Sequence, residues 1–182
     1  EIHGRASEKD LLDSWLLSKI PLLAILGIAG CGKTTLTSYW LNRAISIGPE
    51  YEVMYYPCQP WDSPLGIATS LLHKIGVGVD EGKHDPYNIL EALPLRPGAE
   101  IDIDSYRRRL VAHLLDESDL DTKQESELLV VLDDVHNIGS EGNYLFGALL
   151  QVAEFAPLRL ILISRNRLSF YDTRDVHTRE RV

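Results

Sequence analysis

Long apolar runs are missing from this sequence. Its most apolar segments, residues 22–26, 128–132 and 160–163, hold only four or five residues each, whereas a helix that crosses a bilayer needs about 20. Residues 1–5 are polar and include no initiator Met, unlike a secretory signal. We therefore expect no membrane partner, and we expect the chain to be part of a larger multidomain protein.

Cysteine and positive charge are also scarce. The two cysteines, Cys31 and Cys58, are too few for a disulfide framework, which favours a reducing, cytoplasmic location. Lys and Arg together number 18 against 27 Asp and Glu, a formal charge of −9, so the basic surplus that binds nucleic-acid phosphates is absent. The three successive arginines at 107–109 point in different directions on a helix and favour a solvated face with one salt bridge. Nucleic-acid binding through this domain is therefore disfavoured.

The sequence does contain a regular alternation of strand and helix patterns. The expected strands are 22–26, 51–57, 128–132 and 158–163, and the expected helices are 7–19, 35–47, 64–75, 104–116 and 143–155. A capping box of Ser7 and Asp10 should begin the first helix, and Asp104 should cap the fourth. This order predicts an α/β fold, a three-layer αβα sandwich with a mainly parallel sheet and a site at the carboxyl ends of its strands.

Residues 77–103 interrupt this pattern. Six glycines and prolines fall within them, which excludes one long regular element and predicts an irregular excursion with one helical turn near residues 87–92. Residues 1–182 are therefore expected to form one domain that includes this excursion.

A phosphate-binding motif directly follows the first expected strand. Residues 27–34, GIAGCGKT, match the P-loop pattern G-x-x-x-x-G-K-[ST], which chance would produce in about three of a thousand chains of this composition. Lys33 should reach the β- and γ-phosphates of ATP or ADP, and the Thr34 hydroxyl should ligate Mg²⁺. The plain alternative is a glycine turn that joins a strand to a helix. The residues expected to bind nucleotide here are Gly27, Gly30, Cys31, Gly32, Lys33, Thr34 and Thr35.

Two further strand ends carry polar residues that complement the P-loop. The strand 128–132 ends in Asp133 and Asp134; Asp133 would hold Mg²⁺, and Asp134 would orient or deprotonate the attacking water as a catalytic residue. The last strand ends in Ser164 and Arg165, and Arg165, or Arg167 instead, would sense the γ-phosphate. The alternatives are acids that only cap a strand end and an arginine in a surface loop.

Other conspicuous side chains have simpler interpretations. Tyr55, Tyr56 and Trp61 are expected to pack in the core and at the rim rather than stack on a base. His136 is expected to be a loop residue without a role, and Cys31 a small filler in the P-loop.

Together these motifs resemble the STAND signalling ATPases, the NB-ARC and NACHT-like group. The resemblance rests on Walker A at 27–34, Walker B at 128–134, the strand end at 160–166 and His3-Gly4-Arg5 before the first helix. It implies the sheet order 2-3-4-1-5, and Gly4 and Arg5 over the adenine and ribose with Ile2 and His3 near the base. It also implies a slowly hydrolysing switch that oligomerises when activated and has sensor and effector domains as partners. The fifth core strand and the C-terminal helical and winged-helix subdomains are not expected within this chain, so its turnover should be low.

Three alternatives remain open on the sequence alone. The domain could be a P-loop phosphotransferase or kinase, although no basic lid is evident. It could be a non-catalytic module that binds nucleotide only for assembly. A replication-type AAA+ loader is disfavoured by the acidic charge and by Ser164 and Arg165, where such proteins more often place a polar amide.

Overall fold

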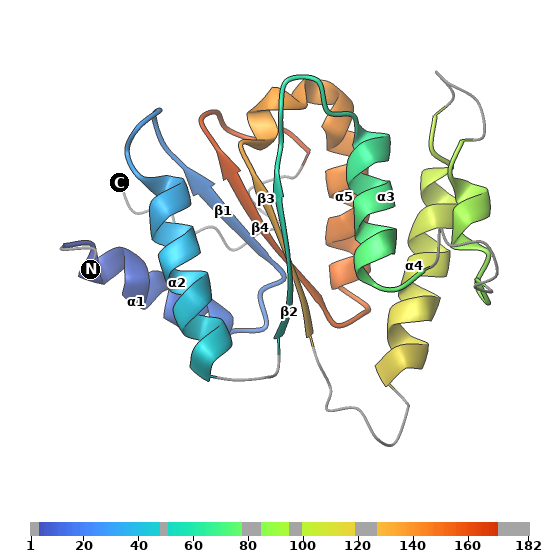
Figure 1. Cartoon of the computed structure of the whole chain (residues 1–182), viewed down its shortest axis with the longest axis horizontal. Helices are drawn as coiled ribbons and strands as arrows, with labels where there is room; N and C mark the ends of the chain where they lie inside the picture. The colour runs from blue at the N-terminus through green and yellow to red at the C-terminus, as the bar shows by residue number, and fades with distance from the viewer. Residues whose placement is uncertain (1–3, 48–50, 78–84, 95–99, 119–126, 171–182) are drawn as a thin grey trace.

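The computed structural model describes residues 4–47, 51–77, 85–94, 100–118 and 127–170. One or more helices separate each strand from the next along the chain (Figure 1). In chain order, with η for a 3₁₀-helix, they are α1 (Ala6–Leu16), β1 (Leu22–Leu26), α2 (Lys33–Ile47), β2 (Tyr51–Pro57), α3 (Pro64–Lys74), η1 (Ile89–Ala92), α4 (Ile103–Ser118), β3 (Glu127–Asp133), η2 (Val135–Asn137), η3 (Gly139–Gly142), α5 (Asn143–Ala153) and β4 (Leu158–Ser164).

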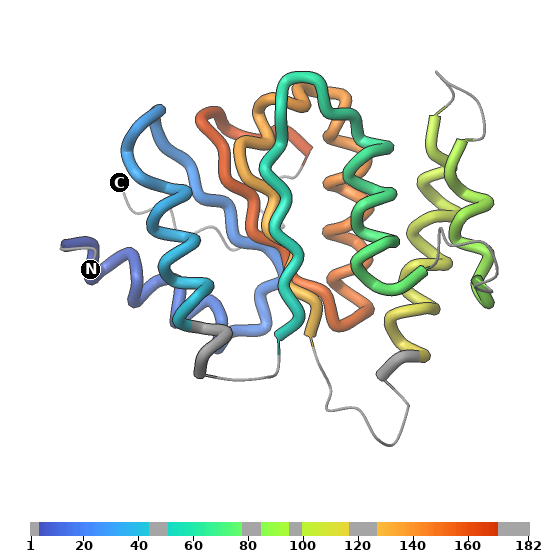
Figure 2. The backbone as a smooth tube through the Cα atoms, viewed as in Figure 1, coloured from blue at the N-terminus to red at the C-terminus, as the bar shows by residue number. Residues whose placement is uncertain are grey.

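Within the described residues, the strands form one parallel sheet in the order β1-β4-β3-β2. β4 therefore lies between the P-loop strand and the strand that ends in Asp133, which confirms the expected order. Because all these strands run the same way, their carboxyl ends meet at one edge of the sheet (Figure 2). The three-layer αβα fold is thereby confirmed, and the polar strand ends are brought to one place.

Side chains from the two faces of the sheet form two separate apolar cores. In β3, Leu128, Val130 and Leu132 face the core shared with α3, α4 and α5, whereas Leu129 and Val131 face the core shared with α1 and α2. Helices α1 and α2 thus cover one face, α3 and α5 cover the other, and α4 packs against α5 on the outside (Figure 1). Strands buried on both faces are typical of parallel sheets and explain their continuous apolar runs.

A buried arginine ties the end of α1 to the sheet. Arg159 in β4 is only 3% exposed, and its guanidinium donates hydrogen bonds of 2.7 to 3.0 Å to four backbone carbonyls. These carbonyls belong to Trp15, Leu16, Ser18 and Ile20. The Arg159 guanidinium carbon also lies 4.2 Å from the centre of the Trp15 ring. This one side chain gives a partner to each of these carbonyls where the chain leaves α1, and the Trp15 carbonyl accepts from Ser18 as well.

Two expected helix starts are wrong in detail. The capping box in α1 does not form: the helix begins at Ala6 after Arg5, whose φ is 58°, and the Ser7 hydroxyl donates to Glu8. In α4 the cap is Asp102, whose carboxylate accepts from the Ser105 backbone at 3.1 Å. The helix can start early because Ile103, apolar and partly buried against the core, already belongs to its first turn.

The excursion at 77–103 is described only in part. One helical turn, η1, confirms the predicted turn, and it is held by the burial of Ile89 and Ala92.

No helix in the described part of the chain has the length and apolar character needed to span a lipid bilayer.

Candidate functional site

The loop between β1 and α2 has a backbone that needs its glycines. Gly30 and Gly32 have φ of 75° and 83°, in the left-handed region that other residues rarely adopt. At Gly27 a Cβ would lie 3.0 Å from the Cys31 sulfur, tighter than ordinary packing. The glycines therefore allow the loop to curl tightly ahead of the helix, as a phosphate-binding loop must.

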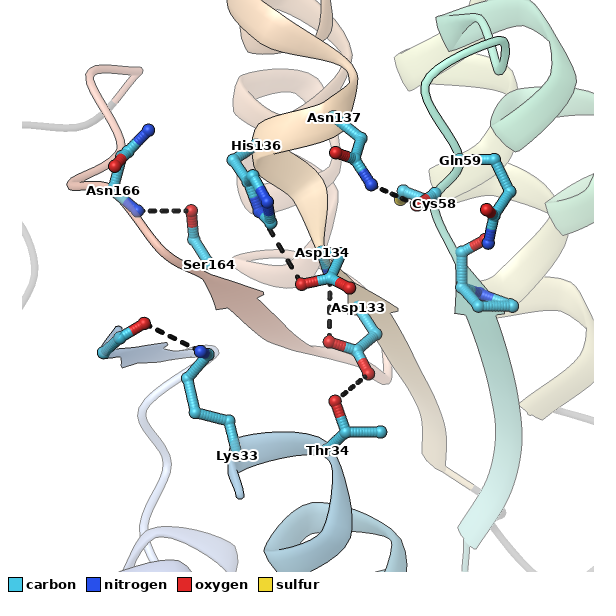
Figure 3. Close-up of polar contacts among 12 residues, drawn as sticks. Lys33, Thr34, Cys58, Gln59, Asp133, Asp134, His136, Asn137, Ser164 and Asn166 are labelled. Atoms are coloured by element: carbon cyan, nitrogen blue, oxygen red, sulfur yellow. Dashed lines mark hydrogen bonds and ion pairs between the residues drawn. The ribbon is translucent and has the colours of Figure 1, made fainter. Parts of the chain in front are cut away.

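The Lys33 side chain folds back into this loop. It is 7% exposed, and its Nζ donates to the carbonyls of Gly27 at 2.7 Å and Ile28 at 3.0 Å. In Figure 3 the Lys33 side chain extends from the start of α2 toward the end of β1. A positive charge beside the start of α2 makes the loop attractive to an anion. Thr35 follows in the first turn of α2 and is exposed.

Asp133 is the centre of a hydrogen-bond cluster at the end of β3. Its side chain is nearly buried, at 3% exposure. Its Oδ2 accepts from the Thr34 hydroxyl at 2.7 Å and from the Tyr55 hydroxyl at 2.6 Å, and its Oδ1 accepts from the Asp134 backbone at 2.8 Å. Figure 3 shows the contacts with Thr34 and Asp134. The P-loop and the Asp133 strand are therefore joined directly.

Tyr55, expected to pack in the core or at the rim, also makes a polar contact at the site. It is 38% exposed and hydrogen-bonded to Asp133. Burial, followed by the hydrogen bond to Asp133 and the charge of that carboxylate, raises the pKa of Tyr55 above its usual value, so the phenol stays protonated and donates. Trp61 is also outside the core, at 80% exposure. The alternation of faces in β2 could have pointed to Tyr55, but only once the pairing of β2 with β3 was known.

The Thr34 and Asp133 pair fits a hard divalent cation. The Thr34 hydroxyl oxygen and the Asp133 Oδ2 can both coordinate a cation, and they lie 2.7 Å apart beside the loop. Among the described residues, no group of three or more His, Cys, Asp and Glu side chains could form a metal cage. Mg²⁺ is usually held by one or two protein oxygens together with nucleotide phosphates and water, so this donor set suits it.

Asp134 points away from Asp133. Its φ of 52° lies in the left-handed region, its side chain is 40% exposed, and its Oδ1 lies 3.7 Å from Nδ1 of His136. The diverging pair gives two neighbouring acids two different environments, as predicted for a strand end (Figure 3). The geometry thus places His136, for which no role was expected, beside the predicted catalytic acid.

Cys58 lies on the other side of Asp133. Its backbone N–H donates to the Asp133 carbonyl at 2.8 Å, and its own carbonyl accepts from the Asn137 side chain. Burial, followed by the negative charges of Asp62, Asp133 and Asp134, raises the pKa of the Cys58 thiol to about 12. The thiol is therefore an inert, protonated packing residue at ordinary pH.

The end of β4 lies beside the P-loop, but Arg165 does not reach into it. The buried Ser164 accepts from the Gly27 backbone at 3.2 Å through its carbonyl. Arg165 and Arg167 are exposed, and within the described part of the chain neither forms a hydrogen bond or ion pair. Arg165 therefore lies at the edge of the sheet that carries the P-loop, but its side chain is not held at the site.

Arg5 is in contact with the P-loop. Its guanidinium donates to the Cys31 carbonyl, and it lies close to Gly32, where an added Cβ would be 3.7 Å from it. Gly4 before it has a φ of 82°. The N-terminal Gly-Arg pair is thus at the loop, whereas Ile2 and His3 lie outside the described residues.

The arginine run at 107–109 forms surface ion pairs. Arg107 pairs with Asp104 at 3.4 Å and Arg109 with Glu91 at 3.1 Å, so two salt bridges form where one was expected. Paired and divergent arginines do not make a phosphate-binding patch.

A family model described as an AAA domain matches residues 19–170 of the chain. No curated protein matches it closely enough in sequence to count as a relative. Similar solved structures include Cdc6p from Pyrobaculum aerophilum, at 16% identity and a TM-score of 0.62, and the ORC1 protein of Aeropyrum pernix in complex with DNA, at 20% and 0.58. These alignments cover 91% and 88% of this chain but only 40% and 37% of the other two. At these identities the likeness shows a shared fold.

Proposed function

The chain belongs to the AAA domain family, and from that premise we propose that it is a switch domain that binds MgATP and MgADP and hydrolyses ATP slowly. The family and the fold support a P-loop ATPase domain in general. The observation that carries the nucleotide site is the 2.7 Å contact between Thr34 and Asp133, with the Lys33 ammonium inside the same loop.

Each side chain at the site has a distinct task in this proposal. The amides of residues 27–34 and the Lys33 ammonium bind the phosphates. Thr34 and Asp133 hold Mg²⁺, which neutralises charge on the β- and γ-phosphate oxygens when bound. Asp134, partly exposed and beside His136, orients or deprotonates the attacking water.

Slow hydrolysis is expected because the Arg165 side chain is not held at the site. A side chain that senses the γ-phosphate must be held within reach of it, and Arg165 is exposed without a described partner. We infer that the arginine engages the phosphate only in a closed or assembled form of the larger protein. Other domains of that protein, or a second copy of the chain, would then be the partners that complete the switch.

The family match does not extend to the STAND class, so the STAND assignment rests on the sequence motifs and on Arg5. The Arg5 contact with the P-loop supports a role for the N-terminal Gly-Arg pair at the nucleotide. The AAA family match covers ATPases more broadly, and the loader alternative uses the same nucleotide chemistry. Salt-sensitive binding of duplex DNA by this domain would favour the loader, whereas its net charge of −9 supports the switch.

Single-turnover hydrolysis tests the catalytic proposal. Asp134→Asn should lower the rate by about 100-fold, in the range that general acid–base residues contribute, while the affinity for fluorescent ATP stays unchanged. Asp104→Asn removes a similar acid from the surface of α4 and should change neither quantity. Equal rates for Asp134→Asn and the unaltered protein would contradict the catalytic role and leave a module that only binds nucleotide.

A further inference from the structure

Tyr55 is the one side chain from outside the P-loop that donates to the Asp133 carboxylate among the described residues. It belongs to β2, an edge strand that pairs with β3 so that Pro57 lies opposite Asp133 and Tyr55 opposite Val131. Side chains two residues apart on a strand share a face, so Tyr55 and Asp133 are diagonal neighbours on the face covered by α2. The pairing of β2 with β3 therefore delivers the phenol to the carboxylate.

Two hydroxyls converge on the same carboxylate oxygen. Oδ2 of Asp133 accepts from Thr34 at 2.7 Å and from Tyr55 at 2.6 Å. The other oxygen accepts from the Asp134 backbone. Tyr55 and the Asp134 amide thus fix the plane of the carboxylate from both sides, independently of Thr34. An orientation fixed in this way does not have to be ordered again when a ligand binds.

Because the Tyr55 ring is partly exposed, the role of its hydroxyl can be tested separately from the packing of the ring. Tyr55 is 38% exposed, so its phenyl group contributes less to the core than a buried aromatic residue does. A phenylalanine would keep the ring contacts and remove only the hydroxyl, which donates to Asp133 and also interacts with the Ser38 side chain. A purely structural role for the residue would therefore survive that substitution.

We propose, building on the function proposed above, that Tyr55 is a positioning residue whose hydroxyl orients Asp133 for the divalent cation that accompanies the nucleotide. Tyr55 itself is not a metal ligand in this scheme and does not touch the nucleotide. Its effect passes through Asp133, as hydrogen-bond partners of metal ligands commonly act. The consequence is that Tyr55 controls how strongly Mg²⁺ promotes nucleotide binding, rather than nucleotide binding itself.

Titration of Mg²⁺ at a fixed concentration of fluorescent ADP tests this proposal. In Tyr55→Phe the Mg²⁺ concentration at half-saturation should rise by about 10-fold, the lower end of the effect seen when a partner of a metal ligand is lost. Affinity for ADP in excess EDTA and the thermal midpoint should not change. Tyr56→Phe is the matched control, because it removes the hydroxyl of the next residue on the strand, which interacts with Asp62 instead.

A double variant tests whether the effect passes through Asp133. Adding Tyr55→Phe to Asp133→Asn should cause no further change, since the carboxylate that the phenol orients is already gone. A further shift in that background would overturn the proposal, and so would a Tyr55→Phe titration identical to that of Tyr56→Phe. If the unaltered protein bound ADP without any response to Mg²⁺, the proposed metal-nucleotide function would fail as well, so the two failures are distinguishable.

Discussion

The Thr34 hydroxyl donates to the Asp133 carboxylate at 2.7 Å across 99 residues of sequence. Thr34 lies in α2, the helix that follows the P-loop strand β1, whereas Asp133 ends β3, and β4 separates these two strands in the sheet. The contact therefore depends on the order of the strands and on their common direction. A fold that assembles this sheet also assembles the site before any ligand binds.

Arg159 should be one of the residues on which stability depends most. Arg159→Met removes the donor to four carbonyls at the end of α1 and leaves Glu127, 3.9 Å away, without its partner. We expect the free energy of unfolding to fall by about 3 kcal/mol or more, as when a buried charged network loses one member. Urea denaturation measures this quantity.

Arg108→Met is the control for that change. Arg108 is an exposed arginine on α4 whose Nε donates to the Asp104 carbonyl at 3.2 Å, and its loss should change stability by about 0.5 kcal/mol or less. Equal effects of the two substitutions would show that the Arg159 network contributes little.

Thr37 in α2 should be replaceable with a gain in stability. Its hydroxyl is fully buried and has no hydrogen-bond partner among the described residues. Thr37→Val keeps the shape and removes the unsatisfied group, which should raise the free energy of unfolding by about 1 kcal/mol. Thr69→Val makes the same change on α3, where the hydroxyl donates to the Leu65 carbonyl at 2.8 Å, and should bring no gain. A loss of stability in Thr37→Val would show that its hydroxyl does find a partner.

Cys58 should make stability fall at high pH. Its thiol has a pKa near 9.0 when unfolded and about 12 when folded. Between these values the unfolded chain loses the proton and the folded chain keeps it, so the unfolded state binds fewer protons. The free energy of unfolding should therefore decrease as pH rises above 9, by at most about 1.4 kcal/mol per pH unit from this group.

Comparing the pH dependence of the protein with that of Cys58→Ala isolates the contribution of the thiol. The variant should show the shallower decline between pH 9 and 10, below the range in which the buried tyrosines add their own dependence. Parallel curves for the two proteins would contradict the assigned environment of Cys58.

The parts of the site that could be predicted from the sequence depend on short-range rules. The glycines of the P-loop, Lys33 and Thr34 have their positions set by a tight turn between a strand and a helix, so their spacing alone indicated them. Asp133 could be found because it directly follows an apolar run. Local rules also gave the strand ends, since continuous apolar segments and breakers mark them.

What the sequence could not show depends on contacts between distant segments. Tyr55 reaches Asp133 only through the register of β2 on β3, and Arg159 meets the end of α1 across more than 130 residues. Neither side chain belongs to a motif. The shift of the α4 cap from Asp104 to Asp102 has the same origin, because packing of Ile103 against the core decides where the helix begins.

Calorimetric titration with MgADP is the most direct test of the central claim, that residues 27–34 bind nucleotide phosphates. The account predicts saturable binding by the unaltered protein. Lys33→Ala should lose about 10- to 100-fold in affinity, because the charge-assisted contacts to the phosphates are lost. Lys74→Ala should bind as the unaltered protein does, because only a surface ion pair with Glu52 is removed. Equal affinities for Lys33→Ala and the unaltered protein, or no binding by either at millimolar nucleotide, would contradict it.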